Sequence, residues 1–150
     1  MDFSLTISTP MNTTEANPLC TPLKLTEGRL CAAHLYFPPG PAGKLHFIAT
    51  FGIHQIIPFN TGESIALDDC VLPLSLGFDL IEPPFLLTCK TWNTSTLYDH
   101  TLFITVTLDP FPDHKWDIDT LMDLYLYGRN PGLPKKRRGS YTRDDPSTRW

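Results

Sequence analysis

The chain has 150 residues, of which 41 % are hydrophobic and 19 % charged, so its length suits one ordinary domain and its composition excludes a chain disordered throughout. No apolar run approaches the roughly 18 residues that span a bilayer, and an acid follows Met1 where a secretory signal would carry positive charge. The net charge of −4 is uneven, because residues 1–128 hold five basic and fourteen acidic residues whereas residues 129–150 hold seven basic and two acidic residues.

Alternating apolar and polar residues predict several short β-strands within the first 108 residues. Such a period of two is typical of a strand with one buried face. The clearest example is 100–108, where Leu102, Ile104, Val106 and Leu108 share a face and β-branched residues abound. Strands are predicted at 3–8, 29–37, 44–51, 53–57, 85–92 and 100–108, with shorter apolar pieces at 65–67 and 71–74.

Prolines and small polar residues predict the connections. Residues 9–22, rich in Thr, Asn and Pro, are predicted to form a loop, and Pro73, Pro83 and Pro84 are expected to limit regular structure around them. Many short strands without intervening helical periods predict a mainly β fold, an antiparallel sandwich or barrel.

A short helix, Asp117–Tyr127, is predicted after the strands. Asp117 is a suitable N-cap, and Gly128 follows where a glycine commonly ends a helix. Large apolar residues lie on more than one side of the helix, which must therefore pack on the sheet or on a partner. The candidate partner-binding residues are Trp116, Leu121, Leu124, Tyr125 and Tyr127.

The last 22 residues are predicted to form a disordered basic tail. They contain Lys135, Lys136, Arg137 and Arg138 in succession, flanked by Pro and Gly. Consecutive cations on an accessible backbone suit an import receptor, and they could also contact nucleic acid or an anionic membrane weakly through phosphates. The chain is thus divided into an acidic β-rich globular domain, 1–128, and a basic tail, 129–150, with a candidate nuclear-localisation signal.

The cysteines and histidines predict neither a metal site nor a cofactor site. Cys20, Cys31, Cys70 and Cys89 are interpreted as buried or half-buried thiols of a reducing compartment. Cys31 and His34 are three residues apart, a spacing that places them on opposite faces of a regular strand.

No catalytic residue is predicted either. His46 and His100 are expected at the surface, and Asp68 and Asp69 in a solvated loop. The sequence Gly77-Phe78-Asp79-Leu80 resembles the first motif of the dUTPase family, an all-β fold. The resemblance covers four residues, and the downstream serine and glycine-rich motifs of that family do not follow.

The favoured hypothesis is a non-enzymatic interaction protein that resembles a small viral accessory protein. We expect it in the nucleus and cytoplasm of a host cell. Its expected partners are an import receptor and a host regulatory protein. The alternative is a matrix-type or nucleoprotein-associated structural protein that self-associates and uses its tail on nucleic acid or an anionic membrane. A dUTPase-like β-barrel, active or relic, is the remote alternative.

Overall fold

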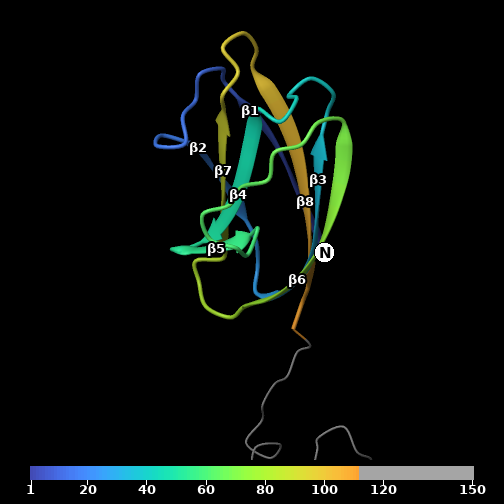
Figure 1. Cartoon of the computed structure of the whole chain (residues 1–150). Coiled ribbons are helices and arrows are strands. Elements are labelled where there is room, and N and C mark those ends of the chain that lie inside the picture. The colour runs from blue at the N-terminus through green and yellow to red at the C-terminus, as the bar shows by residue number, and fades with distance from the viewer. Residues whose placement is uncertain (112–150) are drawn as a thin grey trace, which may run out of the picture. The chain divides into compact units, whose positions relative to one another are not determined.

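The computed structural model describes residues 1–111, which form two four-stranded antiparallel sheets. The strands (Figure 1) are β1 Asp2–Thr9, β2 Leu19–Lys24, β3 Gly28–Phe37, β4 Leu45–Phe51, β5 His54–Ile57, β6 Cys70–Leu80, β7 Leu86–Asn93 and β8 His100–Asp109. Sheet A has the order β1-β8-β3-β6, and sheet B has the order β2-β7-β4-β5. The predicted mainly β fold is therefore confirmed, whereas the predicted helix and basic tail lie outside the described residues.

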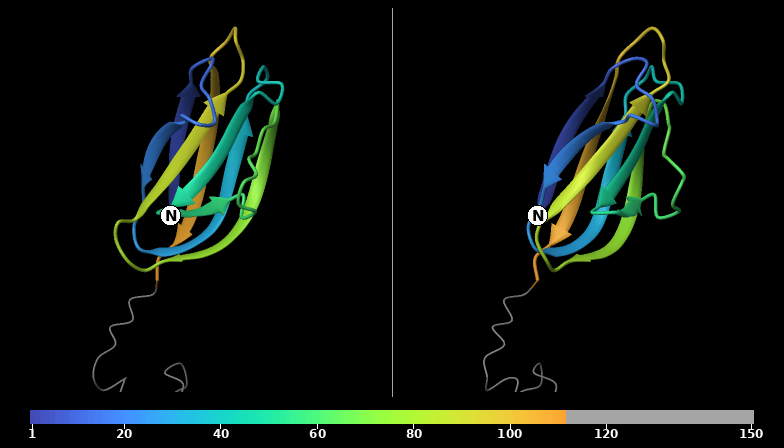
Figure 2. Two further views of the ribbon diagram at one scale, coloured as in Figure 1. Left: turned by 60° about the vertical axis from the view of Figure 1, so that its left-hand side comes forward. Right: turned by 90° about the vertical axis from the view of Figure 1, so that its left-hand side faces the viewer.

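The strand pairing is that of one long hairpin rolled into two sheets. The pairs β1–β8, β2–β7, β3–β6 and β4–β5 are all antiparallel, so the chain doubles back at the turn formed by Gly52 and Ile53. All the other connections cross from one sheet to the other, as the two views in Figure 2 show. An eight-stranded, two-sheet arrangement of this kind is a jelly roll.

The core lies between the two sheets and is built from alternate residues of each strand. In β8 the predicted face is confirmed, because Leu102, Ile104, Val106 and Leu108 are all buried. Sheet B contributes Phe47, Leu87 and other residues of β4 and β7 to the same cluster. Burial of these side chains is the main source of stability, at about 25 cal/mol for each Å² of apolar surface removed from water.

Two prolines lie in edge strands, which explains two differences from the prediction. Residues 9–22 were predicted to form a loop, but β2 begins at Leu19 and includes Pro22; likewise β6 continues through Pro73 to Leu80. Both strands lie at the edge of their sheet. An edge strand tolerates proline because the missing N–H can belong to its unpaired side.

A bulge in β3 changes the expected relation between Cys31 and His34. The register shifts between Leu30 and Ala32, so regular alternation does not hold across Cys31. The Cys31 thiol lies 3.1 Å from Oδ2 of Asp109, whereas His34 is exposed on the outer face of sheet A. Among residues 1–111, no group of three or more His, Cys, Asp or Glu side chains is arranged to hold a metal ion.

Within the same residues, no helix is long and apolar enough to cross a membrane.

Candidate functional site: a crown of apolar residues on two loops

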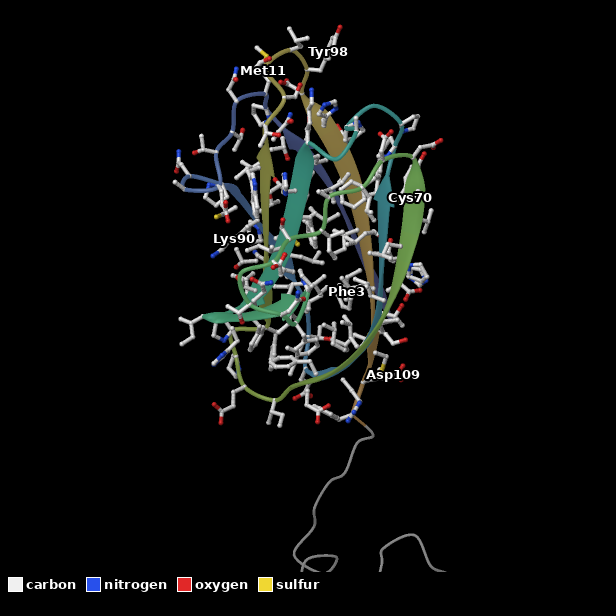
Figure 3. All side chains as sticks on the ribbon, viewed as in Figure 1. Phe3, Met11, Cys70, Lys90, Tyr98 and Asp109 are labelled. Atoms are coloured by element: carbon white, nitrogen blue, oxygen red, sulfur yellow. The ribbon has the colours of Figure 1, made fainter. Side chains whose placement is uncertain are left out.

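Three large apolar side chains are exposed on two loops at one end of the fold. Met11 lies between β1 and β2, whereas Leu97 and Tyr98 lie between β7 and β8. Their exposed fractions are 46, 72 and 68 %. Figure 3 shows Met11 and Tyr98 at the same end of the molecule. We call these three residues the apolar crown.

Asn93 fixes the loop that carries Leu97 and Tyr98. Its side chain is fully buried, and its Nδ2 donates to the carbonyl oxygens of Thr9 (3.3 Å) and Tyr98 (2.9 Å). Its Oδ1 accepts a hydrogen bond from the backbone N–H of Ser95 at 3.0 Å. Because one buried amide bonds to β1 and to both ends of the loop, it holds the loop in one conformation.

Ser95 adds a turn inside this loop. It is buried, and its Oγ accepts hydrogen bonds from the backbone N–H groups of Leu97 (3.4 Å) and Tyr98 (3.2 Å). A serine side chain that bonds to the backbone two and three residues later is a recognised turn former. The two most exposed crown residues therefore project from an ordered turn.

Direct hydrogen bonds join the two crown loops to each other. The backbone N–H of Asn12 donates to the carbonyl oxygen of Ser95 at 2.9 Å, and that of Met11 donates to Oδ1 of Asp99 at 2.8 Å. The backbone N–H of Asn93 donates to the carbonyl oxygen of Thr13 at 3.0 Å. The crown is thus one preorganised surface rather than two independent loops.

The surroundings of the crown are acidic. The loops at this end, 10–18, 38–44 and 94–99, contain Glu15, Lys44 and Asp99 as their charged residues, and Asp68 and Asp69 precede β6 beside them. The Asp68 carboxylate accepts hydrogen bonds from the backbone N–H groups of Gly40 (2.8 Å) and Ala42 (3.0 Å). These two bonds lower the pKa of Asp68, so it is ionised at neutral pH.

A shallow, open pocket of about 390 Å³ lies beside the crown. Trp92 is the one aromatic residue of its lining, although only 6 % of it is exposed, and Glu15 is the one charged residue. A cation can interact favourably with both an indole and a carboxylate. The lining residues are Asn12, Thr13, Thr14, Glu15, Trp92, Asn93 and Thr94.

His46 is half-buried and stacks on Trp92. The two rings are 5.1 Å apart and nearly parallel, and His46 Nδ1 lies 2.9 Å from Oγ of Ser64. Burial lowers the pKa of His46, while the charge of Glu15 acts in the opposite direction. His46 thus faces outward, as expected, but is half-buried rather than fully exposed.

The His46–Ser64 pair brings an imidazole and a hydroxyl together, but its clearest role is structural. In a Ser-His nucleophile pair, a third group normally orients the imidazole. Within residues 1–111, Ser64 is the sole hydrogen-bond partner of the His46 side chain. The pair connects the segment after β5 to the outer face of sheet B, and the backbone of Ile65 in the same segment pairs with that of Phe47 in β4.

The thiols differ in exposure more than the sequence indicated. Cys89 is buried, Cys31 and Cys70 are half-buried, and Cys20 is exposed, so the interpretation is wrong for Cys20. Burial raises the pKa of Cys89 to about 12, which leaves it a neutral thiol. Cys20 differs because it lies in an edge strand and points away from the core.

The four residues that resemble a dUTPase motif lie at the end of β6 and have structural roles. Phe78 packs edge-on against Phe51, with ring centroids 5.4 Å apart, and Leu80 is buried. Asp79 forms a partly exposed ion pair with Arg29 at 3.3 Å. A Cβ atom at Gly77 would meet only the Arg29 guanidinium, at 3.5 Å.

The site residues predicted from the sequence lie outside the described part of the chain. This applies to Trp116, Leu121, Leu124, Tyr125 and Tyr127, and to the cationic group Lys135, Lys136, Arg137 and Arg138. Sequence reasoning missed the crown, because Met11, Leu97 and Tyr98 lie in segments without periodicity. The available signal was the presence of large apolar residues between turn-forming Pro, Asn, Thr and Ser residues.

A scan against protein-family models and searches of curated proteins and solved structures found no match to this chain.

Proposed function

We propose that this chain is a non-enzymatic interaction protein whose apolar crown binds a regulatory protein of a host cell and whose basic segment directs it to the nucleus. The observation that carries the first part is the joint exposure of Met11, Leu97 and Tyr98 on two loops that hydrogen bonds hold rigid. Loops positioned by a rigid β scaffold are common binding sites.

The energetics of the crown favour binding. Apolar side chains that point into water forgo the stabilisation that burial would give them, about 1.5–3 kcal/mol for each large side chain. Because the loops are already ordered, a partner that covers them loses little conformational entropy on binding. Tyr98 is also of a type enriched at the energetic centres of protein interfaces.

The charges around the crown define the partner further. Glu15, Asp68, Asp69 and Asp99 outnumber Lys44 at this end, and both Glu15 and Trp92 line the adjacent pocket. A partner with an apolar pocket bordered by Arg or Lys is therefore complementary. The candidate residues Trp116, Leu121, Leu124, Tyr125 and Tyr127 remain a second proposed binding segment.

Comparative capture from a nuclear extract tests the crown. We expect the double substitution Leu97→Ser and Tyr98→Ser to reduce the recovery of the bound proteins at least tenfold. Glu15→Gln is expected to make this recovery less dependent on the salt concentration. Ile53→Ser is the matched control, since Ile53 is 92 % exposed in the β4–β5 turn. Equal recovery by the wild type and the crown variant would contradict the proposal.

A reporter fusion tests nuclear import by the basic segment. Residues 129–150 fused to a fluorescent protein are expected to accumulate in the nucleus, and alanine at Lys135, Lys136, Arg137 and Arg138 is expected to abolish this. Arg143→Ala with Arg149→Ala is the control, because it removes charge outside the cluster. A fusion that stays cytoplasmic would rule out import by this segment.

A self-assembling structural protein is the second candidate, and the jelly-roll topology favours it. Jelly rolls are found in viral capsid and lectin domains, although fold similarity alone does not determine function. Such a protein would form oligomers and bind nucleic acid or anionic vesicles through its tail. Light scattering and salt titration with and without residues 129–150 distinguish it from the first candidate. A dUTPase-like activity remains the remote alternative, which a nucleotide-hydrolysis assay tests directly.

A further inference from the structure

The edge strands of the two sheets differ in length on one side of the fold. β6, the edge strand of sheet A, has 11 residues, whereas β5, the edge strand of sheet B, has 4. Phe78 of β6 contacts Phe51 of β4, which places both edges on the same side. Within residues 1–111, β3 is the only strand that pairs with β6 (Figure 1). One side of β6 therefore has no backbone partner in this part of the chain.

The inner side chains of β6 are incompletely buried. Leu72, Leu74, Leu76 and Phe78 pack against the core but remain half-buried, whereas Leu35 in the neighbouring strand β3 is fully buried. The short β5 does not extend opposite all of these side chains, so apolar surface remains at the open side of β6. A further strand beside β6, about 4.8 Å away, would cover this surface.

The backbone register identifies the groups that β6 presents at its open side. Met1 and Leu108 exchange two backbone hydrogen bonds, each 2.7 Å long. Because bonded and non-bonded pairs alternate along an antiparallel ladder, the backbone groups of Phe103 face β3 and bond to Tyr36. The N–H and C=O of Tyr36 thus point away from β6. Its partner in β6, Val71, therefore points its own N–H and C=O to the open side.

The same alternation extends along β6. Pro73 and Ser75, opposite His34 and Ala32, also face the open side. Together with Val71 they present two N–H groups and three carbonyl oxygens, because proline has no N–H. An unpaired row of donors and acceptors on an edge strand is a template for pairing with another extended backbone.

The segment that contains β6 is acidic at both ends. Residues 68–82 contain no basic residue and four acidic ones, Asp68, Asp69, Asp79 and Glu82. Arg29 of β3 forms an ion pair with Asp79 alone among these. Antiparallel pairing of two β6 strands would bring the acids of one copy near those of the other, which disfavours self-association through this edge. A strand with basic residues at both ends is complementary instead.

We propose that the open side of β6 binds an extended segment of another protein as an additional antiparallel strand of sheet A. Apolar residues at every second position of that segment cover the half-buried inner side chains of β6, and Lys or Arg at its ends faces the acidic ends of β6. The residues between the apolar ones face outward and exchange hydrogen bonds with Val71 and Ser75. This surface lies on a strand edge and not on the crown loops, so the inference goes beyond the proposed function.

A synthetic peptide tests the proposal. It alternates threonine and valine between two pairs of lysines, and fluorescence anisotropy follows its binding to the full chain at concentrations up to about 1 mM, a range that detects weak complexes. In the proposed pairing, the threonine N–H groups face β6 and the valine N–H groups face water. N-methylation of the threonines is therefore expected to raise the dissociation constant at least tenfold. N-methylation of the valines, the matched control, should leave it almost unchanged.

Variants of the chain provide a second measurement. Val71→Pro removes a donor from the open side without removing a bond to β3, and it is expected to weaken peptide binding at least tenfold. Val71→Thr keeps the donor and is the control, while circular dichroism verifies that both variants fold. Asp69→Asn with Glu82→Gln is expected to weaken binding and to make it less dependent on the salt concentration.

Hydrogen exchange locates the bound peptide. The amide hydrogens of Val71 and Ser75 are expected to exchange rapidly in the free chain and at least tenfold more slowly with the peptide bound. Those of Leu72 and Leu74 bond to β3 and should exchange slowly in both states.

Three results would overturn the proposal. They are the absence of binding up to about 1 mM, equal binding of the two methylated peptides, and slow exchange at Val71 and Ser75 in the free chain. The crown variant Leu97→Ser/Tyr98→Ser should bind the peptide as the wild type does. Failure here and failure of crown binding are therefore separable.

Discussion

Asn93 is the residue on which the order of the crown most depends. Replacing it with alanine removes three hydrogen bonds and leaves the carbonyl oxygens of Thr9 and Tyr98 and the N–H of Ser95 without that partner. We expect Asn93→Ala to lower the free energy of unfolding by about 2–3 kcal/mol, since buried polar groups that lose their partners carry the full desolvation cost. Urea denaturation measures this.

Asn17→Ala is the matched control for that change. The Asn17 side chain is exposed, so its replacement is expected to alter stability by less than about 0.5 kcal/mol. If Asn93→Ala behaves like this control, the side chain of Asn93 does not hold the loop.

His46 makes the stability depend on pH in a defined direction. Burial lowers the pKa of folded His46 below its ordinary value of 6.5, so the unfolded chain binds more protons over this range. The stabilisation is complete above pH 6.5 and is lost as the pH falls through the lower folded pKa. The urea concentration at the unfolding midpoint should therefore decrease as the pH is lowered from 8 to 5.

The His46→Gln variant is expected to lose this component of the pH dependence, while His34→Gln keeps it because His34 is exposed. Asp68 affects the stability at a lower pH than His46 does. Its pKa is lowered from 3.8, so the stabilisation by its ionised carboxylate is lost only in stronger acid. A pH profile that is the same in wild type and His46→Gln would assign the effect to another group.

At the scale of the strands, the close approach of β3 to β8 depends on Gly28. Its φ is +145°, and a Cβ atom there would clash with Cδ2 of Leu108 and with the carbonyl oxygen of Asp109. We expect Gly28→Ala to cost about 2 kcal/mol or more, because both the backbone conformation and the space exclude a side chain. Thermal unfolding measures the loss.

Gly77 is the control for Gly28 within the same sheet. A Cβ at Gly77 would meet only the end of the Arg29 side chain, at 3.5 Å. Gly77→Ala should therefore be neutral or stabilise the protein by a few tenths of a kcal/mol. Equal losses at the two glycines would show that strand propensity, and not the close approach of β8, decides the effect.

The strands could be predicted where the period of two is unbroken, and the exceptions have physical causes. The segments 3–8, 29–37, 44–51, 53–57, 85–92 and 100–108 are all confirmed to within two residues. Segment 19–24 was missed and segment 70–80 was shortened, because Pro22 and Pro73 indicate loops unless the strand is known to lie at an edge. Edge position is a property of the whole sheet and is not visible in local sequence.

At the scale of the whole molecule, the sheet order and the crown could not be predicted. The pairing of Asp2 with Thr107 joins residues far apart in the chain, and no local pattern specifies it. The crown likewise requires Met11 and Asp99 to meet through the folded sheets. The period of two and the proline-rich connections predicted the mainly β class, whereas the crown depends on pairings that only the complete fold defines.

The rolled hairpin also implies an order of assembly. The two-residue turn at Gly52 and Ile53 joins the most local strand pair, while β1 pairs only with β8, at the other end of the described sequence. Bringing distant segments together costs chain entropy before their contacts form, so we expect folding to begin near this turn and to be slow. During synthesis on the ribosome, β1 would wait for nearly a hundred further residues before its only partner in sheet A emerges, and a chaperone that shields it in that interval is expected to increase the folded yield.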